Sequence, residues 1–236
     1  IEEDLQLVMP EAKVARLDLD TTRSRNDYQS ILEHFQDKET NILVGTQMVT
    51  KGLDFDSVKV VGILNADNML SYPDFRAHER SFQLMSQVAG RAGRKGKQGR
   101  VIIQTYEPAH PVLQDVLRND FKGLYDKQMV TRRQFGYPPY YRLILIRLKH
   151  KDYQKLNPAA AELAFMLRPI FQQDLLGPEY PVVSRVKNLY IKQMMVKFKR
   201  EYNAQQVKEI IAQQIRLFQQ NSDYKSVQIQ IDVDPM

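Results

Sequence analysis

Residues 136–139 read GYPP, and this stretch separates two parts of the chain that have different sequence patterns. Two adjacent prolines end a helix, because proline lacks the N–H group that a helix uses and its ring clashes with the preceding turn. The helical pattern of residues 120–134 therefore stops here. The 236 residues are enough for two domains of ordinary size. We expect a first domain over residues 1–118, a helical linker over 119–139 and a second domain over 140–236.

Short apolar runs alternate with helical patterns before the GYPP stretch. The helix between the first two runs begins at Ser24, and Asp27 three residues later completes a capping-box pattern. Strands that alternate with helices favour an α/β domain with a mostly parallel sheet and helices on both faces. The strands are predicted over residues 13–17, 42–44, 58–64 and 101–103.

After GYPP the order changes to strand, helix, two strands, helix and strand. Asn157 followed by Pro158 has the pattern of a helix start, an N-cap with proline at the first helical position. A second helix is expected from Asn203. The order βαββαβ predicts a ferredoxin-like fold for residues 140–236. Its strands are predicted over residues 141–148, 181–186, 190–198 and 227–233.

The formal net charge of +6 is unevenly distributed along the chain. Residues 1–136 hold 19 basic and 19 acidic side chains, whereas residues 137–236 hold 15 basic and 9 acidic ones. A basic domain beside a neutral one favours a polyanionic partner, most often nucleic acid.

Six of these basic residues follow one another between Val182 and Arg200 without an intervening acid. In a ferredoxin-like fold both helices cover one face of the sheet, so we expect the cations on the other, open face. Tyr190 would lie at its edge and stack on bases while the cations contact phosphates. The alternative is a solvated surface in which lysines protect a strand edge. The residues are Arg185, Lys187, Lys192, Lys197, Lys199 and Arg200.

Several classes of protein and site are disfavoured by composition. The chain has no cysteine, which excludes disulfides and thiolate zinc sites, and its 4 histidines lack metal-ligand spacing. No apolar run approaches the roughly 20 residues that span a bilayer, and the first residues do not resemble a signal peptide. We expect no metal site in this chain, no membrane partner and a cytoplasmic location.

The sequence QVAGRAGR at residues 87–94 lies at the end of a helix predicted over 74–94. At 100° per residue, one stripe of this helix carries only arginine and glutamine, with no acid in the stripe to pair with. Gly90 and Gly93 each cost about 1 kcal/mol relative to alanine in a helix, which indicates that something approaches the backbone closely. The stripe consists of Arg76, Arg80, Gln83, Gln87 and Arg94, with Arg91 at its edge.

The arginine fork matches phosphate oxygens, and positioned arginines stabilise the charge that develops on a γ-phosphate during its transfer. We therefore interpret Arg91 and Arg94 as arginine fingers. Gln87, one turn earlier, would orient the γ-phosphate or the attacking water. The alternative is an ordinary solvated helix face.

A second polar cluster follows the strand predicted over residues 42–44. Ligands of parallel sheets bind outside the carboxyl ends of the strands, where Gly45, Thr46 and Gln47 would lie. Their N–H and O–H groups can donate to a phosphate backbone. Asp54, a little further along, could accept from a ribose hydroxyl or hold an arginine.

Three stretches in order, GTQMVTKGLDF, VVGILNAD and QVAGRAGR, resemble motifs V, Va and VI of superfamily 2 helicases. The match is closer to one family. TQMVTKGLDF, LNADNMLSYPDFRAHERSFQLMSQVAGRAGR, VIIQTY, RRQFGYPPYYRL and the terminal IDVDP are together similar to the PriA family of primosomal replication-restart helicases (primosomal protein N′). The resemblance covers nearly the whole chain.

This resemblance implies an ATP-dependent 3′–5′ DNA helicase that recognises stalled or branched replication forks and restarts replication by primosome assembly. Residues 1–118 would be most of its second RecA-like lobe, and residues 140–236 its C-terminal DNA-binding domain. The implied partners are branched and single-stranded DNA, the single-stranded-DNA-binding protein and primosome loading proteins.

The resemblance also implies roles for individual residues. Gln87, Arg91 and Arg94 would act on the nucleotide, whereas Gly45, Thr46, Gly52 and Asp54 would couple nucleotide to DNA. We accordingly expect nucleotide contacts from Gly52, Asp54 and Gly90. The expected DNA-binding residues are Thr46, Gln47, Lys51, Arg185, Lys187, Tyr190, Lys192 and Lys197.

Two helicase motifs are missing from this sequence. It has neither a G-x-x-x-x-G-K-[ST] loop nor a D-E-x-H stretch, so ATP and Mg²⁺ would be bound mainly by a first lobe that is absent here. The family's zinc-binding cysteines are absent too. We expect a C-terminal fragment that binds DNA but does not hydrolyse ATP alone. The alternatives are another superfamily 2 translocase of repair or recombination, and a non-catalytic nucleic-acid-binding module.

Overall fold

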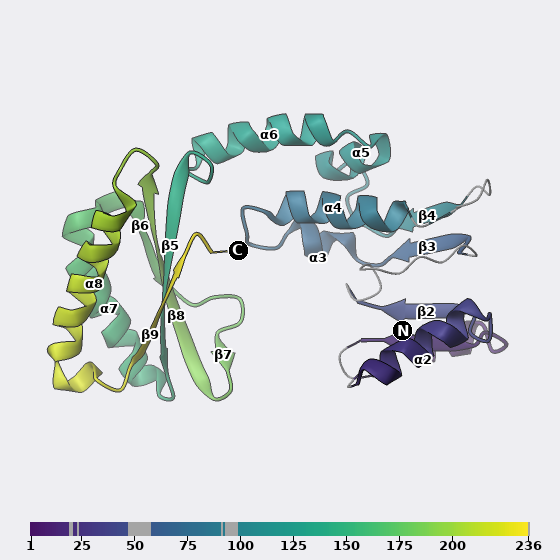
Figure 1. The fold of residues 1–236 in the computed structure, drawn as a ribbon, viewed down its shortest axis with the longest axis horizontal. Helices are drawn as coiled ribbons and strands as arrows, with labels where there is room; N and C mark the ends of the chain where they lie inside the picture. Colours follow the sequence, from purple (N-terminus) through teal and green to yellow (C-terminus); the bar gives the residue numbers. More distant parts are fainter. Residues whose placement is uncertain (19–20, 23, 47–57, 91, 93–98, 236) are drawn as a thin grey trace. The chain divides into compact units, whose positions relative to one another are not determined.

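The computed structural model describes residues 1–235 except 19–20, 23, 47–57, 91 and 93–98. The chain divides into two compact units, Ile1–Leu124 and Tyr125–Met236 (Figure 1).

The first unit contains two pairs of short parallel strands. β1 (Val14–Leu17) pairs with β2 (Ile42–Gly45), and β3 (Val60–Ile63) pairs with β4 (Arg100–Ile103). The predicted strands and their parallel pairing are therefore confirmed. Within the described ranges, no backbone pairing joins the two pairs into one sheet.

The helices of the first unit are α1 (Glu2–Val8), α2 (Arg25–Gln36), α3 (Ala66–Leu70), α4 (Ala77–Ala89), α5 (Pro111–Arg118) and the beginning of α6 (Phe121–Gln134). The capping box that precedes α2 is confirmed. Ser24 Oγ accepts from the Asp27 N–H at 3.1 Å, and Asp27 Oδ2 accepts from the Ser24 N–H at 3.0 Å. The short helices α1, α3 and α5 were not predicted from the sequence.

A buried apolar cluster joins α3, α4, α5 and β3. Phe82 and Met85 of α4 are buried in it, and Leu124 of α6 packs against the same cluster. The predicted opposition of an apolar and a polar side on α4 is therefore confirmed. The helix is shorter than the predicted residues 74–94, because Gly90 forms its C-cap.

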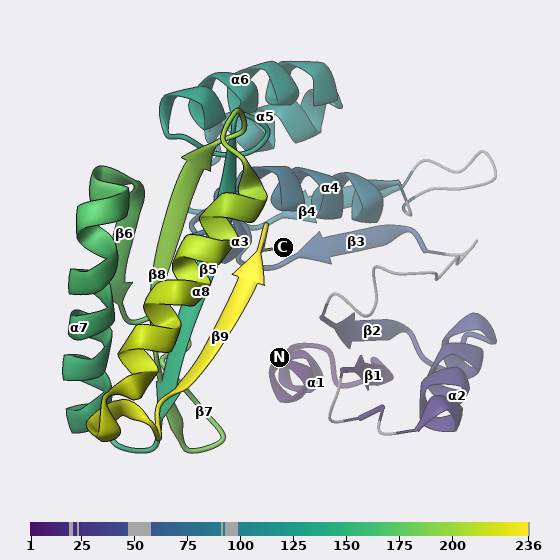
Figure 2. The same cartoon turned by 60° about the vertical axis from the view of Figure 1, so that its left-hand side comes forward.

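The second unit has one antiparallel sheet. β5 (Tyr141–His150), β6 (Leu175–Glu179), β8 (Leu189–Lys199) and β9 (Gln228–Val233) lie in the order β6-β8-β5-β9, and β7 (Arg185–Val186) pairs with β8. Helices α7 (Tyr153–Phe171) and α8 (Ala204–Gln220) lie side by side on one face (Figures 1 and 2). The predicted order strand, helix, two strands, helix, strand is confirmed. β7 lies within the strand predicted over residues 181–186, and β6 is an additional strand that the sequence did not predict.

Two predicted boundaries in this unit are wrong. Helix α7 begins at Tyr153 rather than after Asn157, because Asp152 Oδ1 accepts from the Gln154 N–H at 2.8 Å and caps the helix earlier. The additional turn contributes Leu156, which is fully buried.

The strand predicted over residues 181–186 is shorter than expected, because only Arg185 and Val186 form it as β7. The second strand of the sheet is β6, where Leu175 is buried in the core. Val182 and Val183, which suggested a strand, are 65% and 59% exposed. Burial of Leu175 in the core therefore decides which segment pairs along the sheet, and β-propensity alone misplaced it.

The C-terminal stretch IDVDP is fastened to the start of β5. Asp234 Oδ2 accepts from Arg142 Nη2 at 2.7 Å and from Nε at 3.2 Å, and its Oδ1 accepts from the Leu143 N–H at 3.3 Å. Burial raises the pKa of Asp234, but the hydrogen bonds from Arg142 and Leu143 outweigh it and bring that pKa below its ordinary value. The carboxylate thus stabilises the fold in its charged form.

Replacing this carboxylate should give a pH-dependent loss of stability. A lowered folded-state pKa means that the contribution is present above the unfolded value of about 3.9 and is lost as pH falls through the folded pKa. In urea unfolding, Asp234→Asn should be less stable than the wild type at pH 7, and the difference should shrink towards pH 3. Asp223→Asn, at a site with no such hydrogen bonds, is the control. An unchanged free energy of unfolding for Asp234→Asn at pH 7 would contradict this assignment.

Candidate nucleic-acid and nucleotide interface

The carboxyl ends of β1 and β2 lie at the same edge. Their parallel register aligns Leu17 with Gly45, so Asp18 and Thr46 both follow the paired ends. Thr46 is exposed, as a residue that contacts a ligand must be. Gln47, Lys51, Gly52 and Asp54 lie outside the described residues.

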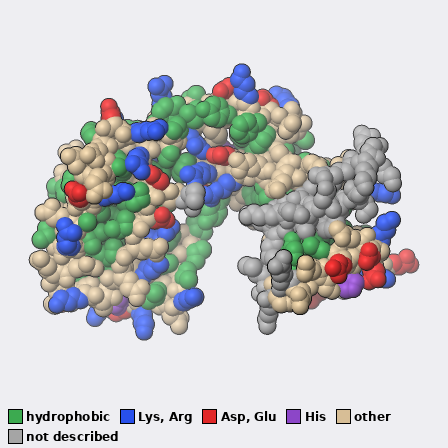
Figure 3. Space-filling view, in the orientation of Figure 1, with side chains coloured by type: hydrophobic (Ala, Val, Ile, Leu, Met, Phe, Trp, Pro, Cys, Tyr) green, Lys and Arg blue, Asp and Glu red, His purple; other side chains and the backbone are tan. Residues whose placement is uncertain are grey.

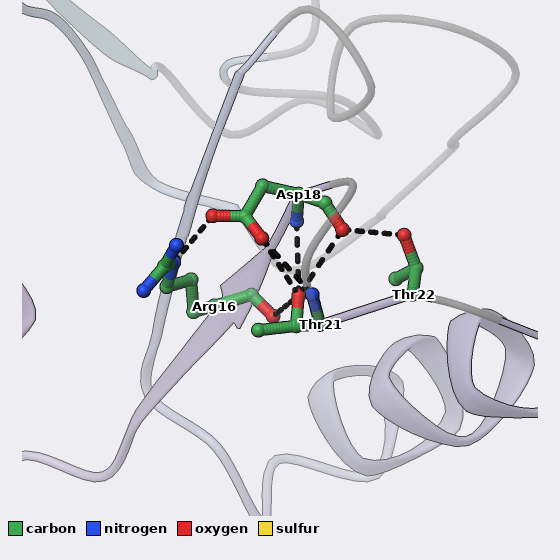
Figure 4. Close-up of polar contacts among 4 residues, drawn as sticks. All are labelled: Arg16, Asp18, Thr21 and Thr22. Atoms are coloured by element: carbon green, nitrogen blue, oxygen red, sulfur yellow. Dashed lines mark hydrogen bonds and ion pairs between the residues drawn. The ribbon is translucent and has the colours of Figure 1, made fainter.

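Asp18, directly after β1, is the centre of a group of polar contacts (Figure 4). The Thr21 N–H donates to Asp18 Oδ1 at 3.1 Å, and the Asp18 N–H donates to Thr21 Oγ1 at 3.1 Å. Arg16 forms an ion pair with the Asp18 carboxylate, and the Thr22 N–H donates to the Asp18 carbonyl at 3.0 Å. Sequence reasoning missed these residues. The signal was present, since Asp followed three residues later by Thr after a strand is typical of a side-chain-stabilised turn.

The polar side of α4 is only partly as predicted. Gln83 and Gln87 are exposed, but Arg80 Nη1 lies 2.8 Å from Asp74 Oδ2, and Gln83 donates to Glu79 Oε1 at 3.5 Å. The stripe itself holds no acid, as predicted, but two acids outside the stripe supply partners to Arg80 and Gln83. Asp74, six residues before Arg80, reaches the stripe from the segment before the helix, and Glu79, four residues before Gln83, reaches it from the first turn.

The end of α4 is open with respect to the residues that the structure describes. Gly90 has φ −65° and ψ −6°, which any residue can adopt, and a Cβ there would lie 3.5 Å from the Ser86 carbonyl oxygen. Nothing in the described part of the chain therefore requires glycine at this position. Arg91 and Arg94 lie outside the described residues.

Two other stretches that carried the family resemblance meet after β3 and β4. Within LNAD, Asp67 Oδ1 accepts from Thr105 Oγ1 at 2.8 Å, and its Oδ2 accepts from the Tyr106 N–H at 3.1 Å. The hydrogen bond from Thr105 is the main cause that lowers the pKa of Asp67 below its ordinary value. The Ala66 N–H also donates to the Gln104 carbonyl at 3.0 Å. These residues hold the two strand ends together.

The basic residues of the second unit do not share one face. The register of β5 with β8 places Lys192 opposite Leu148 and Tyr190 opposite His150, whereas Lys197 lies opposite Leu143. Cross-strand partners point to the same face, and Leu148 belongs to the core beneath the helices. Tyr190 and Lys192 therefore lie on the helix side, and the expectation of one common open face is wrong. Figure 3 accordingly shows Lys and Arg side chains scattered over the visible face of this unit.

Lys197 is half-buried and makes its contacts within the second unit. Its ammonium donates to the Phe135 carbonyl at 3.0 Å and lies 3.7 Å from the centre of the Tyr137 ring. Burial lowers the pKa of Lys197, and the charge of Asp174 opposes this only in part. Lys197 therefore joins the sheet to the segment around GYPP.

Arg185 and Lys192 are each supported by a tyrosine. The Arg185 guanidinium lies 4.9 Å from the centre of the Tyr190 ring, and Lys192 Nζ lies 4.2 Å from that of Tyr180. Neither of these cations, nor the exposed Lys187 in the turn between β7 and β8, forms an ion pair with an acid in the described ranges.

Neither a metal cluster nor a membrane span is found in the part of the chain that the structure describes. No group of three or more histidine, cysteine, aspartate or glutamate side chains there could hold a metal ion. None of its helices has the length and apolar character needed to cross a membrane.

Comparison with known proteins gives two family matches that together cover most of the chain. The model described as "Helicase conserved C-terminal domain" matches residues 2–96, and the model described as "Primosomal protein N C-terminal domain" matches residues 133–236. A designed protein of known structure, Foldit4, covers 41% of this chain with 98% of its own length, at a TM-score of 0.31 and 6% identity, too weak a likeness to inform the fold.

Curated relatives match the chain over its whole length. Replication restart protein PriA of Bacillus subtilis (strain 168) is 39% identical over 237 residues, which are 100% of this chain and 29% of that protein. PriA of Synechocystis sp. is 37% identical over 243 residues, 100% of this chain and 28% of that protein. PriA of Treponema pallidum is 37% identical over 238 residues, 100% of this chain and 35% of that protein. The chain thus spans about a third or less of the length of these relatives.

The open end of α4 predicts that Gly90→Ala is tolerated by the fold. The backbone conformation suits alanine, and such replacements raise stability by about 0.4–1 kcal/mol by restricting the unfolded chain. Thermal unfolding of the 236-residue chain should show an equal or slightly higher midpoint. Gly177→Ala is the matched contrast, because φ there is +89° and the new Cβ would lie 2.8 Å from the Gln193 carbonyl oxygen. A midpoint lowered as much by Gly90→Ala as by Gly177→Ala would show that Gly90 is required by the fold.

Proposed function

Since the chain belongs to the PriA family of replication restart proteins and corresponds to its C-terminal portion, we propose that the whole protein is an ATP-dependent 3′–5′ DNA helicase. It recognises stalled or branched replication forks and restarts replication by assembling the primosome. The match of residues 133–236 to the primosomal domain favours this function over another superfamily 2 translocase of repair or recombination. It also argues against an unrelated nucleic-acid-binding module.

Residues 1–118 act as the second RecA-like lobe, residues 119–139 as a helical linker, and residues 140–236 as a ferredoxin-like DNA-binding domain. The observation that carries the nucleotide role is the open end of α4. Gln87 is exposed there, and Gly90 leaves space on which no described side chain intrudes. This end leads directly into Arg91, so a nucleotide can approach the backbone that precedes both arginines.

In this proposal, the chain supplies the arginines rather than the phosphate cradle. The sequence lacks a P-loop, so ATP and Mg²⁺ are bound mainly by the first lobe, and zinc by a different part of the protein. Arg91 and Arg94 stabilise charge on the γ-phosphate, and Gln87 orients it or the attacking water. Gly52 and Asp54 contribute further contacts to the nucleotide.

DNA contacts come from both units. Thr46 follows the end of β2, Gln47 and Lys51 come after it in the sequence, and all three bind the DNA backbone. In the second unit, Arg185, Lys187 and Lys192 lack acidic partners among the described residues and remain available for phosphates. The DNA is branched or single-stranded, and single-stranded-DNA-binding protein and primosome loading proteins are the further partners.

Replacing Arg91 or Arg94 by alanine in the full-length protein should lower kcat of the DNA-stimulated ATPase roughly 10³-fold or more, because a finger acts only on the transition state. DNA affinity without nucleotide should stay unchanged. Arg80→Ala, whose arginine is engaged with Asp74, is the control and should retain kcat. Normal kcat together with lost DNA binding would assign the two arginines to DNA instead.

Single replacements of Lys192 and Lys197 should separate DNA contact from folding. Each phosphate contact adds about 0.9 to the slope of log K against log salt on duplex DNA. For the 236-residue chain on forked DNA, Lys192→Ala should reduce that slope by about one contact. Lys197→Ala should leave the slope unchanged but lower the free energy of unfolding by about 1–2 kcal/mol, since it loses the ring contact with Tyr137.

Lys225→Ala controls for the loss of one exposed positive charge and should change neither quantity. A slope reduced by Lys197→Ala and not by Lys192→Ala would move the DNA surface to the opposite side of the sheet.

A further inference from the structure

Three planar side chains from three elements meet at one end of the second unit. Arg185 of β7 and Tyr190 of β8 are cross-strand partners, and the guanidinium lies over the Tyr190 ring. Tyr153, the first residue of α7, meets the same ring edge to face, with 5.7 Å between ring centres and 70° between planes. Arg185 Nη2 also donates to Asn188 Oδ1 at 3.2 Å, which fixes the orientation of the guanidinium.

Tyr190 itself is poorly placed to receive a base. Its ring packs partly against the core, Arg185 lies over it, and Tyr153 contacts it at an edge. Tyr153 is 48% exposed, and Arg185 is exposed as well. The groups that can offer a flat surface to a ligand are therefore Tyr153 and the outer face of the guanidinium.

A second pair of a tyrosine and a cation, Tyr180 and Lys192, lies next to these three side chains. We call the surface formed by both groups the margin. Lys192 lies two residues beyond Tyr190 on the same side of β8, about 7 Å along the strand. Its ammonium is held over the Tyr180 ring, whose hydroxyl donates to Asn157 Oδ1 at 2.7 Å. Tyr153 and Asn157 are four residues apart in α7, so one side of this helix borders both pairs.

The charges around this margin favour an anion. Lys151 and Lys155 are exposed on either side of Tyr153, and the only acid between them, Asp152, accepts from the Gln154 N–H. Arg185 and Lys192 form no ion pair in the ranges that the structure describes. Fixed cations beside an exposed aromatic ring suit a chain of phosphates with unpaired bases, because stacking needs a base whose face is free.

We propose that this margin, formed by Tyr153, Tyr180, Arg185, Tyr190 and Lys192, binds single-stranded DNA, with bases stacked on Tyr153 and Arg185 and a phosphate on Lys192. The inference rests on the proposed DNA-binding function of the second unit. It adds that this unit binds DNA in its single-stranded form. Duplex DNA, whose base faces are covered, gains only the phosphate contact.

The test measures binding of the 236-residue chain to a fluorescent dT oligomer and to an abasic oligomer of equal length and charge. Tyr153→Leu should weaken binding to the dT oligomer roughly 5- to 150-fold, the loss of one stacked base. Its binding to the abasic oligomer and to blunt duplex DNA should stay unchanged. Tyr153→Phe, which keeps the ring, should bind the dT oligomer like the wild type.

Tyr202→Leu is the matched control, because Tyr202 is also exposed but follows the opposite end of β8. Unchanged dT binding by Tyr153→Leu overturns the inference, and so does an equal loss on the abasic oligomer, which would indicate a general effect on phosphate binding or on folding. If the wild type binds forked DNA while Tyr153→Leu has no effect, the proposed function stands and only the margin fails. A wild-type chain that binds no DNA at all overturns both.

Discussion

The backbone register between β5 and β8 is the constraint on which most of the second unit depends. All 10 residues of β5 pair with β8, and alternate side chains along each strand point to opposite faces. This register sets Ile144, Ile146 and Leu148 in the core beneath α7 and α8. A shift by one residue would turn that apolar row away from the helices and out of this core, so the register is strongly specified. Because the register is fixed, the positions of the basic side chains of β8 are fixed too.

Two lysines of β8, Lys192 and Lys197, show the effect of this alternation of side chains between the two faces of the sheet. Lys197 takes the face opposite the helices, where the segment before β5 offers a carbonyl and an aromatic ring. Lys192 takes the helix side, where a tyrosine supports its charge and no described acid neutralises it. The same residue type in the same strand therefore serves the fold at one position and remains available to a ligand at the other.

The first unit combines structural and chemical roles within the stretches that identify the family. Asp67 and Gln104 hold the ends of β3 and β4 together through hydrogen bonds to backbone groups. Asp18 instead binds Thr21 within the segment that follows β1. Gln87 and Gly90, in contrast, are exposed, and no described side chain lies within 4 Å of a Cβ placed at Gly90. Strands of only four residues require such fastened ends if their loops are to present side chains in a defined geometry.

The sequence by itself determined the family, the order of the main strands and helices, the capping box before α2 and the concentration of positive charge in residues 137–236. These features follow from local spacing and composition, which a linear chain displays directly. It also predicted the apolar and polar sides of α4, although the pairing of Arg80 with Asp74 depended on where the helix begins. Only the tertiary structure decided that α7 begins at Tyr153 and that β6 precedes the exposed valines. It likewise decided that Lys192 and Lys197 lie on opposite faces of the sheet. The physical reason is that burial in one shared core and the register of strands depend on residues far apart in the chain.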